Sequence, residues 1–418
     1  MEKSILLISL LGVVSASYAA DTTQVDKPKA TSIAQPNATQ PAAAQPKADG
    51  DDTGKFTFTG YLDTYYFANF NNPIDRMNIG VGGGARAFDQ RAGQFQLGIV
   101  QAKATYTNDK VDAVFDIAFG NNADLGNYGN TVSLNGGAAT STALAIKQAY
   151  VTLKATPKLS FTAGQFGTHI GYEVIDAPVN YNYSLSNLFN NGPFYHLGLK
   201  AQYAFSDRVA LMVGVVNNID RNFDNNRSKG IITQLFISPV SGWNVYLNAI
   251  SSNEANVRSG DTGAGKDTTG QYTLFDITTT YQITSKFFMG LNAAIGSQTG
   301  GYQQGNPYAT GTFTDKARSW GGVAIYSNYA FTDKFGMGIR YETFDNANGA
   351  RATLAADGTG VTINSVTLTG NITTGNGHLL LKPELRLDSY SKDKFLTDVS
   401  GKLTRSQTTL GMAAIFKF

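Results

Sequence analysis

The chain has 418 residues, of which 42% are hydrophobic and only 15% charged, compared with about 25% charged in an average soluble domain. A formal net charge of +2 provides no strongly basic surface for a nucleic acid, and the absence of cysteine excludes disulfides and thiolate metal sites. No stretch after the N-terminus approaches the roughly 18 apolar residues of a membrane-spanning helix, whereas 45 glycines, 25 phenylalanines and 21 tyrosines suit an apolar surface spread over many strands.

The first 19 residues have the three parts of a secretory signal peptide. Residues 1–3 are a short charged start, residues 4–14 are an apolar core, and Ser17 and Ala19 are the small residues before a cleavage site. We expect cleavage after Ala19. The alternative, an anchor that stays in the membrane, is disfavoured because the apolar core is too short to span a bilayer.

Residues 20–54 are rich in Pro, Ala, Gln, Thr and Asp. Such a composition buries too little apolar surface to offset the loss of chain entropy on folding. We therefore expect a disordered periplasmic leader, with a docking peptide as the alternative.

From Lys55 onward, apolar and polar residues alternate with a period of two. Residues 335–342 show the pattern clearly, because Phe, Met, Ile and Tyr alternate there with Gly, Gly, Arg and Glu. Residues 111–119 and 196–205 repeat it. In a strand, the two sets lie on opposite faces, so one face suits lipid while the other carries charge and glycine.

The connections between these strands fall into two length classes. Short, turn-forming segments are expected at 107–110, 156–158, 206–208, 239–242, 284–286, 332–334 and 374–377. Long polar segments are expected near 71–92, 121–141, 168–194, 219–228, 252–270, 298–317, 344–361 and 391–405. Their alternation predicts an all-β fold, a transmembrane antiparallel β-barrel of about sixteen strands over residues 55–418, with short periplasmic turns and long extracellular loops.

The last strand ends on an aromatic residue, Phe418, and Leu410, Met412, Ala414 and Phe416 share its face. This ending resembles the C-terminal strand that the barrel assembly machinery recognises. We therefore expect that machinery, and the lipids of the outer membrane, to be partners of the chain.

Four charges of alternating sign, on Lys382, Glu384, Arg386 and Asp388, share one face of a predicted strand. We call them the charged ladder. Each charge would cost about 2–4 kcal/mol at the lipid midplane, so the ladder must face the lumen. It either selects solutes or merely stiffens the wall. Pro383 lacks a backbone donor, so we expect a local bulge there.

Further charges are expected to line the lumen. They are Asp63, Asp112, Asp116, Lys200, Asp276, Arg340 and Glu342. Strand 95–106 changes phase, so a bulge leaves the side of Lys103 open.

The long segment 168–194 has few charges, chiefly Glu173 and Asp176, and many aromatic residues. Long loops are usually functional or disordered, and the aromatic content argues against disorder. We expect this loop to fold into the barrel as a constriction, with its carboxylates facing wall cations such as Lys200 and Arg340. The alternative is a lid on the rim or against another subunit.

Signatures of an enzyme are lacking. His169, His196 and His378 are far apart in sequence and show no metal-ligand spacing. We expect no catalytic activity, no cofactor and no metal.

Several segments resemble the β-barrel porins of the Bacteroidetes, often called OmpL-like. They are residues 56–66, 164–167, 171–173, 192–198 and 382–386. The resemblance implies an outer-membrane porin and no defined substrate.

The predicted function is passive diffusion of small hydrophilic solutes across the outer membrane, and the sequence is compatible with a homo-oligomer. The alternative is a non-conducting barrel that acts as a surface scaffold or binding protein through its loops. An energy-coupled receptor is disfavoured, because residues 20–54 are too short and polar to form a plug domain.

Overall fold

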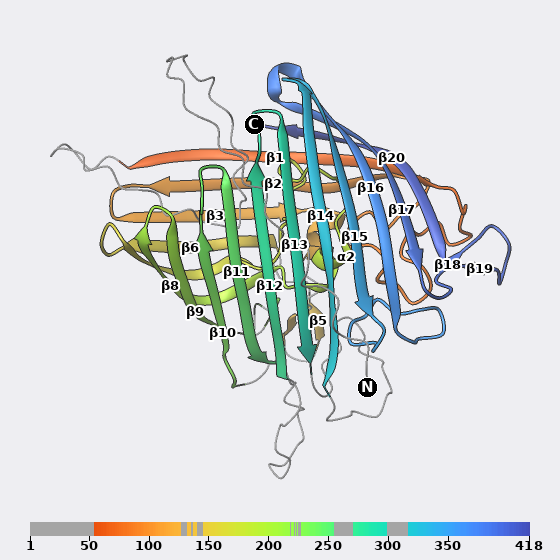
Figure 1. The fold of residues 1–418 in the computed structure, drawn as a ribbon, viewed down its shortest axis with the longest axis horizontal. Coiled ribbons are helices and arrows are strands. Elements are labelled where there is room, and N and C mark those ends of the chain that lie inside the picture. The colour runs from red at the N-terminus through yellow and green to blue at the C-terminus, as the bar shows by residue number, and fades with distance from the viewer. Residues whose placement is uncertain are drawn as a thin grey trace, which may run out of the picture. The chain divides into compact units, whose positions relative to one another are not determined.

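The structure, shown in Figure 1, is a computed structural model. It describes residues 54–126, 132–134, 137–139, 145–217, 219–220, 222, 224, 227–254, 271–298 and 317–418. All of these belong to the larger of two units into which the chain divides, Ala34–Phe418. The expected signal peptide and leader, up to residue 53, lie outside the described residues.

The described residues form a closed antiparallel barrel of sixteen strands, in which β1 pairs with β20 to close the ring. The strand count and fold class predicted from the sequence are confirmed. Figure 1 shows the strands lying side by side around the barrel. They are β1 (Lys55–Asn69), β2 (Phe95–Thr107), β3 (Val111–Phe119), β6 (Ile146–Lys154), β7 (Leu159–Gly167), β8 (Tyr195–Ser206), β9 (Val209–Val216), β10 (Gly230–Ile237), β11 (Trp243–Asn253), β12 (Gln271–Gln282), β13 (Phe287–Gln298), β14 (Arg318–Thr332), β15 (Phe335–Asn346), β16 (Val361–Thr374), β17 (Leu379–Tyr390) and β20 (Ser406–Lys417).

The connections sort by length, as predicted. Every second one is a short turn, such as the step from Thr332 to Phe335, so the short turns gather at one end of the barrel. The long connections gather at the other end, which we call the long-loop end. Two of them carry two-stranded hairpins, β4–β5 (Val132–Leu134 and Gly137–Ala139) and β18–β19 (Phe395–Leu396 and Leu403–Thr404).

Helix is scarce in the described part of the chain. Its named elements are α1 (Asn121–Gly126), α2 (Asn187–Asn191) and the 3₁₀ turn Gly375–Gly377. Among the described residues, no helix is long and apolar enough to cross a membrane.

The two faces of the strands differ as the alternation predicts. On β15, Ile339 and Tyr341 are each 48% exposed and point outward, whereas Arg340 and Glu342 are buried on the inner face. The outward row presents apolar surface to lipid, and the inward row keeps the charges out of it.

Strand β2 contains the expected bulge. Between the pairs Leu62–Val100 and Thr64–Leu97, β2 has one residue more than β1. The carboxylate of Asp63 fills the gap and accepts a hydrogen bond from the backbone of Ile99 at 2.5 Å. Beyond the bulge, Lys103 pairs in register with Asp116, which puts it on the inner face.

The prediction of a bulge at Pro383 is wrong. The register between β16 and β17 is the same on both sides of Pro383, and the pairing with β20 is continuous through it. Gly370 makes the regular pairing feasible, because a Cβ there would lie only 3.0 Å from Cγ of Pro383. The missing side chain makes room for the ring, so the strand does not need an extra residue.

The inner face of β9 to β12 differs from the charge and glycine that the sequence suggested. Met212, Ile232, Ile250 and Leu274 all point inward there and are buried. They belong to one hydrophobic cluster with Ile170 and Leu188, which come from the connection between β7 and β8. These apolar residues face inward because a chain segment, and not water, covers them.

Candidate functional site

The connection between β7 and β8, residues 168–194, lies inside the barrel, and we call it the inward loop. The hydroxyl of Tyr183 donates a hydrogen bond to Asp63 of β1 at 2.5 Å, and the amide of Gly171 donates to Asp276 of β12 at 3.2 Å. These two strands lie far apart around the closed ring. A loop that contacts both must cross the interior.

Glycines on the inner wall leave room for the aromatic residues of this loop. A Cβ at Gly290 would lie 3.1 Å from Cε2 of Tyr172, and one at Gly338 would lie 3.1 Å from Cβ of Tyr181. Tyr172 also packs on Tyr326 of the wall, with 4.0 Å between the ring centroids. The aromatic content noted in the sequence therefore packs against the wall.

The charged ladder on β17 fastens the inward loop through its backbone. All four ladder residues are buried, with 1–3% exposure. Three of them bond to main-chain groups of the loop. The contacts are Lys382 Nζ to Asn180 O, Tyr183 N to Glu384 Oε2 (2.6 Å), Ser184 N to Glu384 Oε1 (3.0 Å) and Arg386 Nη1 to Leu185 O (2.6 Å). These bonds satisfy backbone groups that a loop without regular structure leaves unpaired.

Arg340 of β15 joins the wall to a carboxylate of the loop. Its Nη1 lies 2.5 Å from Oε1 of Glu173, and both side chains are buried. Neighbouring Glu342 accepts a hydrogen bond from the amide of Asn187 at 2.6 Å and lies 3.5 Å from Arg386. Arg340 is one of the wall cations that the loop carboxylates were expected to face, and its pair with Glu173 belongs to a wider buried network.

The fourth ladder residue, Asp388, contacts a different connection. Its carboxylate lies 2.8 Å from Arg86 and 2.9 Å from Arg386. Arg86 belongs to the connection between β1 and β2 and also pairs with Asp89 at 2.6 Å. The ladder therefore holds two connections inside the barrel.

The second carboxylate of the loop, Asp176, lies near another part of the wall. It pairs with Lys147 of β6 and accepts a hydrogen bond from Gln101 of β2 at 3.1 Å. Lys147 also lies 3.6 Å from Asp116 of β3. Asp116 therefore helps to hold the loop through Lys147.

Asp112 forms an ion pair apart from the network that holds the loop. It pairs with Lys154 of β6 at 2.7 Å, and the two side chains are 31% and 32% exposed. This pair presents charge to solvent on the inner wall, whereas the ladder does not.

Comparison with known proteins identifies the family. Residues 55–418 match the family described as "Putative beta-barrel porin-2, OmpL-like". The chain belongs to this family of β-barrel porins. It is accordingly an outer-membrane porin that passes small hydrophilic solutes by passive diffusion. No curated protein sequence matches the chain.

Solved structures resemble this porin in fold. The outer-membrane protein OmpT of Vibrio cholerae is 13% identical, with a TM-score of 0.52, covering 89% of this chain and 99% of its own. The outer membrane channel DcaP of Acinetobacter baumannii is 10% identical, with a TM-score of 0.53 and the same coverage. The anion-selective porin of Comamonas acidovorans is 9% identical, with a TM-score of 0.52, covering 88% of this chain and 100% of its own.

Two histidines of the porin lie together, which corrects the view that all three are far apart. The rings of His169 and His196 have centroids 5.7 Å apart, although 26 other residues separate them in the chain. His378 is elsewhere, at the short-turn end, where its Nδ1 lies 2.8 Å from Lys417 O. Among the described residues, no cluster of three potential metal ligands occurs.

The expectation that Lys200 faces a loop carboxylate is wrong. Its Nζ lies 4.3 Å from the centroid of the Phe166 ring. The carboxylates of the loop lie elsewhere, with Glu173 on Arg340 and Asp176 on Lys147.

Sequence reasoning missed Arg86 and Lys147, both of which hold parts of the site. Arg86 follows a glycine-rich run that looks only like a flexible segment, and nothing local shows that it reaches β17. Lys147 lies where the register between β3 and β6 shifts, so simple alternation does not assign its face. Both could be found only from contacts between distant segments.

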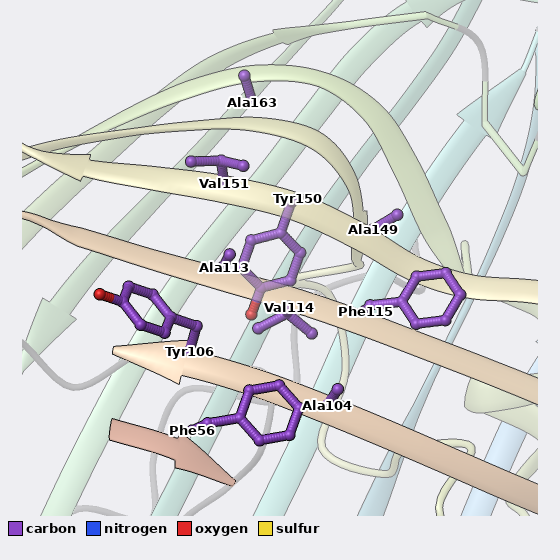
Figure 2. Close-up of a pocket in the computed structure, with 10 residues that line it drawn as sticks. All are labelled: Phe56, Ala104, Tyr106, Ala113, Val114, Phe115, Ala149, Tyr150, Val151 and Ala163. Atoms are coloured by element: carbon purple, nitrogen blue, oxygen red, sulfur yellow. The ribbon is translucent and has the colours of Figure 1, made fainter. Parts of the chain in front are cut away.

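The outer face of the porin has a hollow of about 430 Å³ over β1, β2, β3, β6 and β7. Figure 2 shows the aromatic rings of Phe56, Tyr106 and Phe115 on three of these strands, together with small alanine side chains such as Ala104. Phe56 and Phe115 are 66% and 49% exposed. This apolar hollow is on the lipid side of the wall and is separate from the solute path.

Proposed function

We propose that the inward loop is the constriction of this porin, and that solutes diffuse past it along the remaining lumen wall. The observation that carries the proposal is the attachment of one loop to β1, β12, β15 and β17 across the interior. A segment held in this way reduces the cross-section open to water.

The solute path is proposed to avoid the side of β12 to β14. The hollow left between the loop and those strands, lined by Gly171, Leu274 and Trp320 among others, holds only about 20 Å³. A single water needs about 10–15 Å³ measured in the same way, so this side is packed. The partly exposed pair Asp112 and Lys154 supports a path along β3 and β6.

The ladder residues are proposed to act as positioning groups for the loop. Their burial, and their bonds to Asn180, Tyr183, Ser184 and Leu185, favour this role over direct contact with solutes. Arg340, Glu342, Asp116, Glu173 and Asp176 share it. Asp112 and Lys200 are the two members of the expected lumen set that we assign to the solute path itself.

We propose no catalytic role for the chain. The hydroxyl of Thr168 lies 3.0 Å from Nε2 of His196, which is the geometry of a hydroxyl–imidazole pair. However, Nδ1 of His196 has no hydrogen-bond partner among the described residues, so no carboxylate orients the ring. If Thr168 were a nucleophile and His196 its base, the carboxylate that orients such a base would be missing among the described residues.

We propose three steps of biogenesis from features of the sequence. A signal peptide is removed after Ala19, the long loops face outward, and the assembly machinery reads the strand that ends at Phe418. We also propose that copies of the chain associate in the membrane. One solved form of Vibrio cholerae OmpT is a trimer, and chemical cross-linking of native outer membranes tests the same property here.

Liposome swelling tests the constriction proposal. Vesicles that contain the porin are placed in sugars of increasing mass, and the largest sugar that enters is recorded. A variant without residues 179–186 should admit larger sugars than the wild type. An unchanged size limit in a correctly folded variant would place the constriction elsewhere.

A further inference from the structure

Lys200 is a wall cation without a carboxylate partner in the described part of the chain. It lies on the inner face of β8 and is half-buried. Its stem passes over Gly214 of β9, where a Cβ would lie 2.9 Å from its own Cβ. The described ion pairs include the inward cations Arg86, Lys147, Arg340 and Arg386, but none involves Lys200.

Two imidazoles extend this basic region toward the root of the inward loop. The ring of Phe166, under the Lys200 ammonium, lies 6.3 Å from the ring of His196, which in turn lies 5.7 Å from that of His169. Nε2 of His169 lies 3.2 Å from the carbonyl of Ala249, which can only accept, so Nε2 carries the proton.

The other ring nitrogens of the two histidines are unused. Nδ1 of His169 and Nδ1 of His196 are both buried and have no hydrogen-bond partner among the described residues. Buried polar atoms are normally paired, so two such atoms on neighbouring rings mark an unsatisfied region. Each of these nitrogens would be satisfied by a proton on Nδ1 together with an acceptor for that proton.

Two acidic side chains that attach the inward loop already have partners. Asp276 of β12 accepts from Asn248, Asn292 and the loop backbone, and Glu173 is paired with Arg340. Burial lowers the pKa of His169 to about 4, and the charge of Lys200 lowers it too, whereas backbone hydrogen bonds with Ala249 and Thr233 act in the opposite direction. Lys200 therefore acts on both imidazoles, and none of the described ion pairs neutralises its charge.

We propose that Lys200, His169 and His196 form a binding subsite for small oxyanions, such as inorganic phosphate or a carboxylate, at the root of the inward loop. Lys200 supplies the fixed charge that the anion meets from the lumen. The anion then favours protonation of an imidazole, because it provides the acceptor for the Nδ1 proton. Binding is stronger at lower pH for this reason.

This subsite rests on the proposed function, because the anion reaches it from the solute path. It would make the pore a weak trap for anions at the narrow part of the lumen. Ion binding that is favourable enough to attract but weak enough to release is what a selective channel requires.

Nuclear magnetic resonance of the three histidines tests the proposal on the intact chain. The porin is labelled with ¹⁵N-histidine, placed in lipid nanodiscs at pH 6, and titrated with inorganic phosphate against potassium chloride of equal ionic strength. Phosphate should shift the imidazole signals of His169 and His196. His378 is the internal control and should not move, because it lies at the short-turn end.

Lys200→Met keeps the apolar stem and removes the charge. It should weaken the phosphate response by about tenfold or more, as expected for a charge-assisted hydrogen bond. The matched control is Lys154→Met, which removes a lysine that is paired with Asp112, and it should leave the response unchanged.

Three results would overturn the subsite. They are no shift with phosphate in the wild type, an equal shift of all three histidines, and an undiminished shift in Lys200→Met. If Lys200→Met does not assemble, the wild-type comparison with His378 still decides. Conductance in potassium chloride alone reports the channel, so a pore that conducts but shows no histidine response contradicts only the subsite.

Discussion

Arg340 and Glu173 lie 167 positions apart in the sequence and form a buried ion pair, with 2.5 Å between Nη1 and Oε1. The pair joins the barrel wall to the inward loop. Removal of two charges from water is costly, and only close pairing and further hydrogen bonds compensate for it. Here the guanidinium also donates to the carbonyl of Ser184 at 2.5 Å and to Thr367 at 3.1 Å.

A double-mutant cycle on this pair should show strong coupling. Arg340→Met or Glu173→Gln alone leaves a buried charge without its main partner and should lower the free energy of unfolding by about 3–5 kcal/mol. The double variant should lose much less than the sum of the two. Urea unfolding in lipid vesicles, followed by tryptophan fluorescence, measures the free energy of unfolding of the two single variants and the double variant. Additive losses would show that the pair does not act as a unit.

Glu384→Ala should loosen the inward loop without opening the barrel. Two amides, of Tyr183 and Ser184, lose their acceptor. We expect open-channel current noise to rise and the mean conductance to increase up to about twofold, since the loop gains mobility near residue 183. The control is Asp112→Ala, which removes a wall carboxylate that is paired apart from the network that holds the loop. Equal noise in both variants would argue against positioning by the ladder.

Cysteine labelling tests the orientation of the barrel. Asp357 is exposed at the long-loop end, and Asp333 is exposed in a short turn. Asp357→Cys should react with a membrane-impermeant maleimide on intact cells. Asp333→Cys should react only after the outer membrane is breached. The opposite result would reverse the topology.

Asp220, in the connection between β9 and β10, should make stability depend on pH. Its carboxylate accepts hydrogen bonds from the amides of Phe194 and Tyr195, at 2.6 and 3.0 Å. Burial raises its pKa from 3.8 to about 7. Folding therefore favours the protonated form, and the stability that this group contributes falls as the pH rises from about 4 to about 7.

Asp220→Asn should remove this dependence. The free energy of unfolding of the variant should exceed that of the wild type by on the order of a few kcal/mol at pH 8, and should equal it at pH 4. Thermal unfolding in detergent at the two pH values measures the difference. A gain that is the same at both pH values would mean that titration of Asp220 is not its cause.

The barrel itself was predictable from sequence because alternation and turn chemistry are local. The alternation of apolar and charged residues assigns both faces of β15, because Ile339 and Tyr341 alternate with Arg340 and Glu342. The inward folding of residues 168–194 was also predictable, since so many aromatic residues are unfavourable in water.

The remaining features depend on contacts between distant segments, which no local pattern encodes. The regular pairing at Pro383 depends on Gly370 of the next strand, and the partner of Asp388 is Arg86 from the first long connection. Lys200 was expected to meet a loop carboxylate because charge alone was considered. Its neighbours in the fold are an aromatic ring and two histidines.

Single-channel recording in planar bilayers tests the central claim most directly. The wild type is compared with a variant that lacks residues 179–186, the part of the inward loop that bonds to Lys382, Glu384 and Arg386. Assembly of both proteins is checked first by their heat-modifiable migration. If the loop is the constriction, the deletion raises the conductance severalfold. An unchanged conductance in a correctly assembled barrel would contradict the account.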